Sequence, residues 1–492
     1  PSDVPRLHRP CGGPTNGQMR AEPQAAPSKV EGAAPYRADP RIESLAEWLA
    51  DEVEPAHFPM HELRFRNCRW DKAIGLGELS DEQWIAHFGR FEPLPDNLPH
   101  PLALRYHGHQ FRVYNPEIGD GRGFTFAQVR DGGGRLLDLG TKGSGLTPYS
   151  RTADGRLTLK GAVREILATE MLEALGVDTS KTLSVIETGE QRERHDEPAP
   201  TRSGVLVRLS HSHIRIGTFQ RLAVLGEDEH MRQLVDYCLA NFPGPLPPEG
   251  APGRDEPAAI LMHQAVERLA DLAASYMVAG FVHGVLNSDN MNVTGESFDY
   301  GPWRWLPRWE PGFTAAYFDH SGLYAFGRQP EAIRWNLGQL AIALRRLSEA
   351  EPLVAAFNRF GDCYAAAMTR RFCWRLGVDS RGIEADSALI AAAERTMREG
   401  GIGPDEFFFR HRGGRSATDA LAEALADYEP IADDHPFWSD SAPQSMLIDE
   451  VEAIWSAIAK HDDWQPLADK IAAVRRMGCA LGMAPEPAGH GA

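Results

Sequence analysis

Residues 281–291 read Phe-Val-His-Gly-Val-Leu-Asn-Ser-Asp-Asn-Met, and residues 298–302 read Phe-Asp-Tyr-Gly-Pro. Three side chains in these stretches, Asp289, Asn290 and Asp299, carry hard oxygen atoms of the kind that Mg²⁺ prefers as ligands. Asp289 and Asn290 are adjacent, and Asp299 follows after a short run of apolar and polar residues. The pattern therefore predicts a magnesium site.

The same parts recur in protein kinases, which place an Asp and an Asn in one loop and a second Asp in an Asp-Phe-Gly sequence. In this chain Asp299-Tyr-Gly stands where Asp-Phe-Gly would stand. Val285, however, occupies the position at which the kinase loop carries its catalytic Asp. The loop therefore resembles that of a kinase but lacks the usual catalytic base, so any proposed function must place the base elsewhere.

The composition narrows the class of protein. A chain of 492 residues with 42% hydrophobic and 24% charged residues is typical of a soluble globular protein with two lobes or two to three domains. The net charge of −18 argues against nucleic acid or an anionic membrane as the main partner. The six cysteines form no Cys-x-x-Cys pair, which favours reduced thiols and a cytoplasmic location but leaves an isolated disulfide open.

The order of the elements predicts an α+β fold with two lobes, like that of a protein kinase. We expect a disordered leader at residues 1–40, rich in Pro, Ala and Gly, and a flexible tail at residues 485–492. Between them we expect a β-rich N-lobe with an N-terminal extension at residues 41–218 and a mainly helical C-lobe at residues 219–484. The N-lobe should include a helix that carries a functional Glu.

Local patterns place the elements. Apolar spacing predicts helices at residues 41–53, 80–88, 159–176 and 260–277, and the last of these leads into His283. A capping box is expected at Ser80. Two β-prone runs at residues 124–130 and 135–142 are joined by Asp131-Gly-Gly-Gly, a strong hairpin signal. Further strands are expected at residues 183–188 and 204–209.

Candidate phosphate-binding groups lie in the β-rich half. Closely spaced glycines at residues 119–123 could let backbone N–H groups approach a phosphate, although such a run is more often a plain turn. Lys142 ends a predicted strand and Glu165 lies early in the next helix, as in the kinase Lys–Glu pair, although each alone is an ordinary surface charge. Arg208 and Arg215 suit phosphate oxygens. The two His-x-His pairs, at residues 107–109 and 211–213, offer only two ligands each, so we expect them to be ordinary hydrogen-bonding histidines.

Taken together, the chain resembles the selenoprotein O family, pseudokinases that act as protein adenylyltransferases. The resemblance covers residues 102–344 and rests on ordered motifs: Tyr106-x-Gly-His-Gln-Phe, Gly119-Asp-Gly-Arg, the run from Lys142 to Arg151, Val207-Arg-Leu, residues 283–290, residues 298–302 and Trp335-Asn-Leu. It implies that Asp289 is the general base and that Asn290 and Asp299 bind metal. The nucleotide contacts that it implies are Gly119, Gly121, Arg122, Lys142, Asp154, Gly155, Arg208, Arg215 and Asp299, with Glu165 as the partner of Lys142.

The chain departs from the family pattern at Arg112 and at the C-terminal end, and the residues before His57 also match it poorly. Arg112 stands where the family commonly has Gly, and residues 485–492 contain no counterpart of the family's C-terminal selenocysteine or cysteine. The resemblance further implies that ATP binds in an orientation inverted relative to kinases. AMP would then pass to a Ser, Thr or Tyr hydroxyl of a protein, with Mg²⁺ or Mn²⁺ as the metal. We expect a monomer that binds neither nucleic acid nor membrane.

Three functions remain open from the sequence. The first is transfer of AMP to proteins, with transfer of UMP as a variant. The second is transfer of the γ-phosphoryl group, which fits the kinase parts but not Val285. The third is a nucleotide-binding scaffold without activity, which has no physical need for the full set of Lys142, Glu165, Asp289, Asn290 and Asp299.

Overall fold

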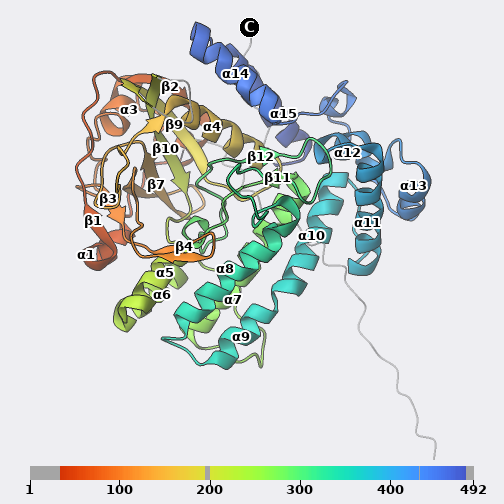
Figure 1. Ribbon diagram of the computed structural model, residues 1–492, viewed down its shortest axis with the longest axis horizontal. Helices are drawn as coiled ribbons and strands as arrows, with labels where there is room; N and C mark the ends of the chain where they lie inside the picture. Colours follow the sequence, from red (N-terminus) through yellow and green to blue (C-terminus); the bar gives the residue numbers. More distant parts are fainter. Residues whose placement is uncertain (1–33, 194–199, 432, 484–492) are drawn as a thin grey trace, which may run out of the picture.

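An antiparallel sheet of eight strands forms the N-terminal half of the protein. The computed structural model describes residues 34–193, 200–431 and 433–483. The sheet has the order β1-β3-β6-β7-β10-β9-β2, with β8 paired to β10 (Figure 1). Its strands are β1 (Ala50–Glu52), β2 (Glu62–Arg66), β3 (Leu102–Leu104), β6 (Thr125–Arg130), β7 (Leu136–Lys142), β8 (Leu157–Thr158), β9 (Lys181–Arg192) and β10 (Thr201–Ser210).

The hairpin β6–β7 forms where the sequence predicts it. Asp131 stabilises the turn, because its Oδ1 accepts hydrogen bonds from the backbone N–H groups of Gly133 and Arg135, each at 2.9 Å. Gly134 has a φ of +83°, which glycine adopts without a steric penalty. The strands then pair from Thr125 opposite Gly140 to Arg130 opposite Leu136, which carries β7 to its end at Lys142.

Helix α4 (Leu159–Ala174) packs against β9 and β10. It begins at Thr158, whose side chain accepts a hydrogen bond from the N–H of Gly161, and Gly176 follows its end with a φ of +72°. An apolar face that includes Val163, Ile166 and Met171 is buried in the core, as the predicted stripe requires. Because this helix crosses the sheet beside β10, Glu165 is brought to the end of β7.

Two predictions at the N-terminal side need correction. The predicted helix at residues 41–53 ends at Leu49, after a 3₁₀ turn (Arg41–Leu45) and α1 (Ala46–Leu49). Residues 50–52 instead pair with β3, so that sheet pairing overrides the helical pattern. Most of the predicted leader lies outside the described residues, but Ala38 pairs with Val129 and Asp39 forms an ion pair with Arg130, so the folded part begins before residue 40.

The remaining helices near the sheet are short. They are α2 (Cys68–Ala73) and α3 (Asp81–Phe88). The capping box predicted at Ser80 is confirmed, because its side chain accepts from the N–H of Gln83 and the Gln83 side chain accepts from the N–H of Ser80. A separate two-stranded hairpin, β4 (Gly108–Gln110) and β5 (Val113–Asn115), lies between the sheet and the helical half.

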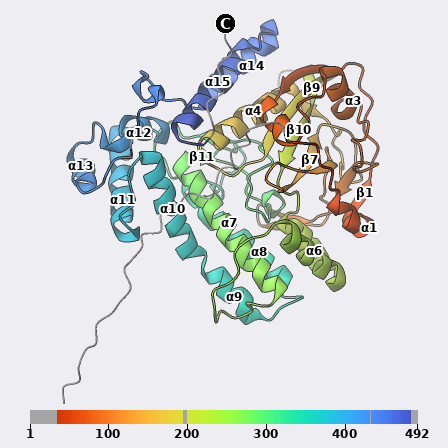
Figure 2. The ribbon, with the colours of Figure 1, turned by 180° about the vertical axis from the view of Figure 1, so that it is seen from behind.

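The C-terminal half is mainly helical, and α7 (Pro257–Ala279) runs through its middle, beside α8 and α10 (Figure 2). This helix ends at Gly280, with a φ of +69°, and leads into β11 (Phe281–Val282), which pairs with β12 (Arg304–Trp305). The other helices of this half are α5 (Ile216–Leu225), α6 (Asp228–Asn241), α8 (Gln329–Leu344), α9 (Ala350–Asn358), α10 (Phe360–Leu376), α11 (Ile383–Gly400), α12 (Pro404–Arg410), α13 (Asp419–Leu425), α14 (Ile448–His461) and α15 (Gln465–Ala480).

The last two helices return to the sheet. Helices α14 and α15 both contact α4, and Arg475 on α15 forms an ion pair with Glu170 on α4 at 2.6 Å. The end of the chain therefore supports the helix that carries Glu165, rather than lying only with the other helices. The predicted tail at residues 485–492 lies outside the described residues.

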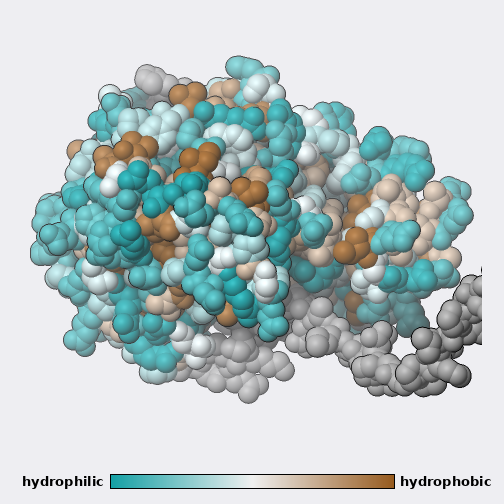
Figure 3. Space-filling view, turned by 90° about the horizontal axis from the view of Figure 1, so that it is seen from below, coloured by the Kyte–Doolittle hydropathy of each residue, from teal (hydrophilic) through white to brown (hydrophobic). Residues whose placement is uncertain are grey.

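Across the described ranges, every helix is too short or too polar to cross a membrane. The face seen in Figure 3 is mostly hydrophilic and carries separate small patches of hydrophobic side chains. The predicted combination of an antiparallel sheet in the N-terminal half and helices in the C-terminal half is thus confirmed.

Candidate active site

A buried ion pair joins the sheet to α4. Nζ of Lys142 lies 2.6 Å from Oε2 of Glu165, and both side chains are buried. Burial lowers the pKa of Lys142, while the carboxylates of Glu165 and Asp299 act in the opposite direction. The second carboxylate oxygen of Glu165 has no hydrogen-bond partner among the described residues. The structure therefore brings together the Lys and the Glu that the sequence pairs.

Asp299 lies at the centre of a cationic cluster. Its Oδ1 accepts a hydrogen bond from Arg208 Nη1, its Oδ2 lies 2.6 Å from Arg215 Nη1, and Nζ of Lys142 is 3.8 Å away. Burial alone would raise the pKa of Asp299, but the three cations outweigh it and hold this pKa well below its usual range. Asp299 also has a φ of +59°, a conformation that Asp and Asn tolerate better than most residues.

Two groups outside the predicted set hold the arginines in place. Asp120, within the glycine-rich run, lies 3.0 Å from Arg215 Nη2. His213 accepts a hydrogen bond from Arg208 Nε at 3.0 Å, and its Nδ1 lies 3.1 Å from Asp138. The carboxylate of Asp138 therefore favours the tautomer in which Nε2 is free to accept. The histidines of both His-x-His pairs make hydrogen bonds within the chain, which confirms that prediction.

The loop after β11 presents Asp289 and Asn290. Asp289 is buried, and its Oδ2 accepts a 3.3 Å hydrogen bond from Gln110 Nε2. Its Oδ1 has no hydrogen-bond partner among the described residues. Burial raises the pKa of Asp289 to about 6. An acid with this pKa is ionised at pH 7 but close enough to neutrality to exchange a proton, as a general base requires.

Asn290 has one end of its amide fixed. Its Nδ2 donates to the backbone oxygen of Val285 at 3.0 Å, which leaves Oδ1 available as a ligand. In the part of the chain that the structure describes, no three His, Cys, Asp or Glu side chains are grouped closely enough to hold a metal ion by themselves. The hard oxygens of Asn290 and Asp299 fit Mg²⁺ or Mn²⁺, with phosphate oxygens and water completing the shell.

The glycine-rich run lies beside the end of β7. The backbone oxygen of Arg122 accepts from the N–H of Gly143 at 2.6 Å. A Cβ on Gly119 would lie 2.4 Å from the ring of Tyr149, and one on Gly121 would lie 3.0 Å from the Tyr149 backbone oxygen. Packing against Tyr149 therefore requires Gly119 to lack a side chain, whether or not a phosphate binds there. The Arg122 side chain is exposed.

Asp154 and Gly155 lie in the loop that follows β7. Gly155 has a φ of +69°, and a Cβ there would lie 2.2 Å from the backbone oxygen of Gly145. Asp154 accepts from the N–H of Arg156 at 3.0 Å and lies 3.9 Å from Arg192. These contacts are separate from the cluster around Asp299. The nucleotide contacts of Asp154, Gly155 and Arg122 stay predictions, as do those of the residues in the cluster.

The sequence analysis assigned no role to three residues of the site. Gln110 contacts Asp289, Asp120 contacts Arg215, and His213 contacts Arg208. Gln110 and Asp120 stand inside the motifs on which the family resemblance rests, and His213 stands in a His-x-His pair. The partners of Gln110 and Asp120 lie 179 and 95 residues away along the chain, whereas His213 and Arg208 are only five residues apart.

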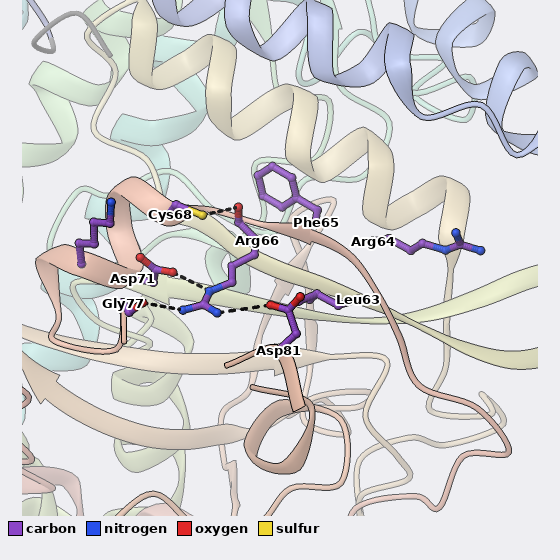
Figure 4. Close-up of a pocket in the computed structure, with 9 residues that line it drawn as sticks. Leu63, Arg64, Phe65, Arg66, Cys68, Asp71, Gly77 and Asp81 are labelled. Carbon is purple, nitrogen blue, oxygen red and sulfur yellow. Dashed lines mark hydrogen bonds and ion pairs between the residues drawn. The ribbon is translucent and has the colours of Figure 1, made fainter. Parts of the chain in front are cut away.

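A surface hollow of about 370 Å³ lies elsewhere, at the edge strand β2 (Figure 4). The Arg66 side chain lines this hollow, and its hydrogen-bond donors are taken up within the chain. Its guanidinium donates to the Asp71 carboxylate at 2.6 Å and to the backbone oxygen of Leu79 at 2.7 Å. It also lies 4.2 Å from the ring centre of Trp84. Because the chain itself satisfies Arg66, this hollow does not compete with the Asp299 cluster as the active site.

Comparisons with known proteins identify the family of this chain. The family described as "Protein adenylyltransferase SelO" matches residues 34–429. A "Protein nucleotidyltransferase YdiU" of Synechococcus elongatus is 44% identical over 88% of this chain and 93% of its own length. The protein of the same description from Synechocystis sp. is 40% identical over 88% of this chain and 96% of its own. The chain therefore belongs to the SelO family of protein adenylyltransferases.

Proposed function

We propose that this protein transfers AMP from ATP to Ser, Thr or Tyr hydroxyl groups of other proteins and releases pyrophosphate. The proposal rests chiefly on one observation: Val285 stands at the usual position of the kinase base, while one oxygen of the buried Asp289 carboxylate has no partner among the residues that the structure describes. Together with the Lys142–Glu165 pair, this supports a bilobal kinase-like fold in which the acceptor hydroxyl attacks the α-phosphorus of ATP, rather than the γ-phosphorus that kinases use.

Lys142, Arg208 and Arg215 would bind the β- and γ-phosphates. All three are buried and lie around the Asp299 carboxylate, while Lys142 also pairs with Glu165 and Arg215 with Asp120. Buried cations stabilise developing negative charge more strongly than exposed ones do. In this position they would stabilise the charge that builds on pyrophosphate as the leaving group, with Arg122 and the glycine-rich run beside them.

Asn290 and Asp299 would hold the metal ion, Mg²⁺ or Mn²⁺, which when bound neutralises phosphate charge. The arginines have to release Asp299 for this to happen, because both of its oxygens contact them in the free protein. When the nucleotide binds, its phosphate oxygens replace the Asp299 carboxylate as the partners of the two arginines. The two changes are therefore coupled, and each favours the other.

Asp289 would act as the general base. Its ionised carboxylate accepts the proton of the acceptor hydroxyl, whose oxygen forms a bond to the α-phosphorus. The bond from that phosphorus to the bridging oxygen breaks, and the electron pair leaves with pyrophosphate. Gln110 would orient Asp289, since its amide nitrogen contacts Oδ2 and its own Oε1 accepts from Asn115 at 3.1 Å.

The products distinguish this function from that of a kinase. Incubation with ATP, Mg²⁺ and a mixture of acceptor proteins should yield pyrophosphate in equal amount to protein-bound AMP. Formation of ADP and phosphoprotein would instead identify a γ-phosphoryl transferase, the reading that the Lys142–Glu165 pair alone would favour. A parallel reaction with UTP would establish whether the enzyme prefers AMP or UMP transfer. A monomeric state and a cytoplasmic location stay predictions from the sequence.

A further inference from the structure

The hairpin β4–β5 is fastened to the loop that carries Asp289. Ser288 Oγ accepts a hydrogen bond from the N–H of His109 at 2.7 Å, and Asn287 Oδ1 accepts one from the N–H of Phe111 at 2.9 Å. With the Gln110–Asp289 contact, three successive hairpin residues bond three successive positions of the loop. Any movement of this hairpin would therefore move Asp289.

An unbroken series of aromatic contacts runs outward from this junction. The Tyr324 hydroxyl donates to Asn287 at 2.7 Å, and its ring lies 5.0 Å from that of Phe111. Phe111 lies 5.7 Å from Phe318, which lies 5.1 Å from Tyr317. The series therefore runs from Asn287, two residues before Asp289, to Tyr317 on the surface.

The outer end of this series is unusually exposed for apolar side chains. Tyr317 is 85% exposed and Phe318 43% exposed; Val113, which lies outside the series but two residues after Phe111 in the hairpin, is 69% exposed. Exposed aromatic residues beside a site commonly mark the place where a partner binds, because large rings contribute much contact area at little entropic cost. We call Val113, Tyr317 and Phe318 the docking rim.

We propose that the docking rim binds the segment of the acceptor protein next to the modified hydroxyl, and that it selects an apolar residue there. This inference rests on the proposed function, because it concerns the acceptor side of the same site. The rim is connected to Asp289 through Phe111 and Asn287, so a segment lying on it would be held beside the base.

The charged side chains beside the hairpin turn are paired within the chain, so the apolar rings of the rim set the preference for an apolar segment. Arg112 lies 3.1 Å from Glu331, which is also 3.4 Å from Arg328, and the one net positive charge of these three groups further disfavours Lys. Arg112 has a φ of +64° and its guanidinium lies 5.4 Å from the ring centre of Trp335. These contacts hold the hairpin turn in a conformation that a residue other than glycine adopts only at a cost.

The test uses short synthetic peptides with a single Ser, Thr or Tyr. One flanking position at a time carries Leu, Phe, Asp or Lys, and labelling is followed with ATP labelled at both the α- and the γ-phosphate. The wild-type protein should label peptides with Leu or Phe at one flanking position about tenfold more efficiently, in kcat/KM, than those with Asp or Lys. Tyr317→Ala and Val113→Asp should remove this preference while the Kd for ATP stays unchanged.

Two matched controls separate docking from other effects. Tyr317→Phe keeps the ring and should keep the preference, whereas equal loss in this variant would mean that the hydroxyl matters and would overturn the proposal. Val354→Asp introduces the same charge at an exposed apolar position on α9 and should change nothing.

Three results would overturn the proposal: no flanking preference in the wild type, an unchanged preference in Tyr317→Ala and Val113→Asp, or labelling of whole proteins without labelling of any peptide. Label that arrives from the γ-phosphate would refute the proposed function instead. The flanking preference would still be measurable in that case, so the two failures are distinguishable.

Discussion

Replacing Asp299 by Asn should tighten metal-free ATP binding while it abolishes turnover. In the free protein the Asp299 carboxylate competes with phosphate for Arg208 and Arg215, since both of its oxygens contact them. Asparagine is nearly isosteric and tolerates the φ of +59° found at this position. It removes the negative charge and the anionic metal ligand without disturbing the backbone.

The magnitude follows from the contacts. Two unit charges 2.6 Å apart, the distance from Asp299 to Arg215, attract by about 6 kcal/mol at an effective dielectric constant of about 20. Desolvation and water cancel most of this, and a hydrogen bond to a charged group contributes about 1.5–3 kcal/mol net. Because the one amide oxygen of Asn can still accept a neutral hydrogen bond from one of the arginines, we expect the lower end of that range, which corresponds to a Kd for ATP about tenfold lower.

The assay is isothermal titration calorimetry with ATP in the presence of EDTA and again in the presence of Mg²⁺. In EDTA the variant should bind ATP more tightly than the wild type. With Mg²⁺ its rate of AMP transfer should fall by at least about 100-fold, since even the loss of a partner of a metal ligand costs 10–100-fold. Weaker binding of ATP in EDTA would refute the competition, and retained turnover would remove Asp299 from the metal site.

Three further predictions concern the base and the lysine. Asp289→Asn should lower the rate of AMP transfer by about 10²–10⁴-fold with little change in the Kd for ATP, and equal losses in both would argue against a base. Burial raises the pKa of Asp289 to about 6, and the base must be ionised to act. We therefore expect kcat/KM to fall tenfold for each pH unit below 6 and to level off above pH 6. A fall in kcat/KM that begins only near pH 4 would contradict this assignment. Lys142→Ala should weaken ATP binding, measured by calorimetry. The control is Lys160→Ala, which removes a partly buried ion pair with Glu452 from the same helix that carries Glu165; an unchanged Kd for Lys142→Ala would refute its assignment.

Elements set by neighbouring residues could be predicted from the sequence. The β6–β7 hairpin depends on Asp131 and the glycines beside it, and α3 depends on the Ser80 capping box. Helix α4 follows its apolar stripe between Thr158 and Gly176. Lys142 and Glu165 could be paired because the order of strand and helix in kinase-like proteins brings such residues together.

Contacts between distant parts of the chain could not be predicted. Gln110 and Asp289 are 179 residues apart, and nothing local indicates that an amide faces the base. Residues 50–52 have a helical pattern but join β3, about fifty residues away. A strand's partners are set by the whole sheet, so pattern alone does not decide such a case.

The packing of the C-terminal helices also depends on contacts between residues far apart in the sequence. Arg475 and Glu170 are 305 residues apart, and their ion pair fixes α15 against α4. A division of the chain at residue 219 into a β-rich and a helical lobe separates two segments that support each other. Composition and order predicted both halves, but only the three-dimensional structure shows that the last two helices also pack against α4 in the first half.

The most direct test of the account is to supply ATP labelled at the α-phosphate or at the γ-phosphate, with Mg²⁺ and acceptor proteins, and to measure covalent label on protein. Asp299→Asn serves as the inactive control. The account predicts label from the α-phosphate alone, which is lost in the variant. Label from the γ-phosphate alone would contradict it and identify a kinase whose base has moved from position 285 to Asp289.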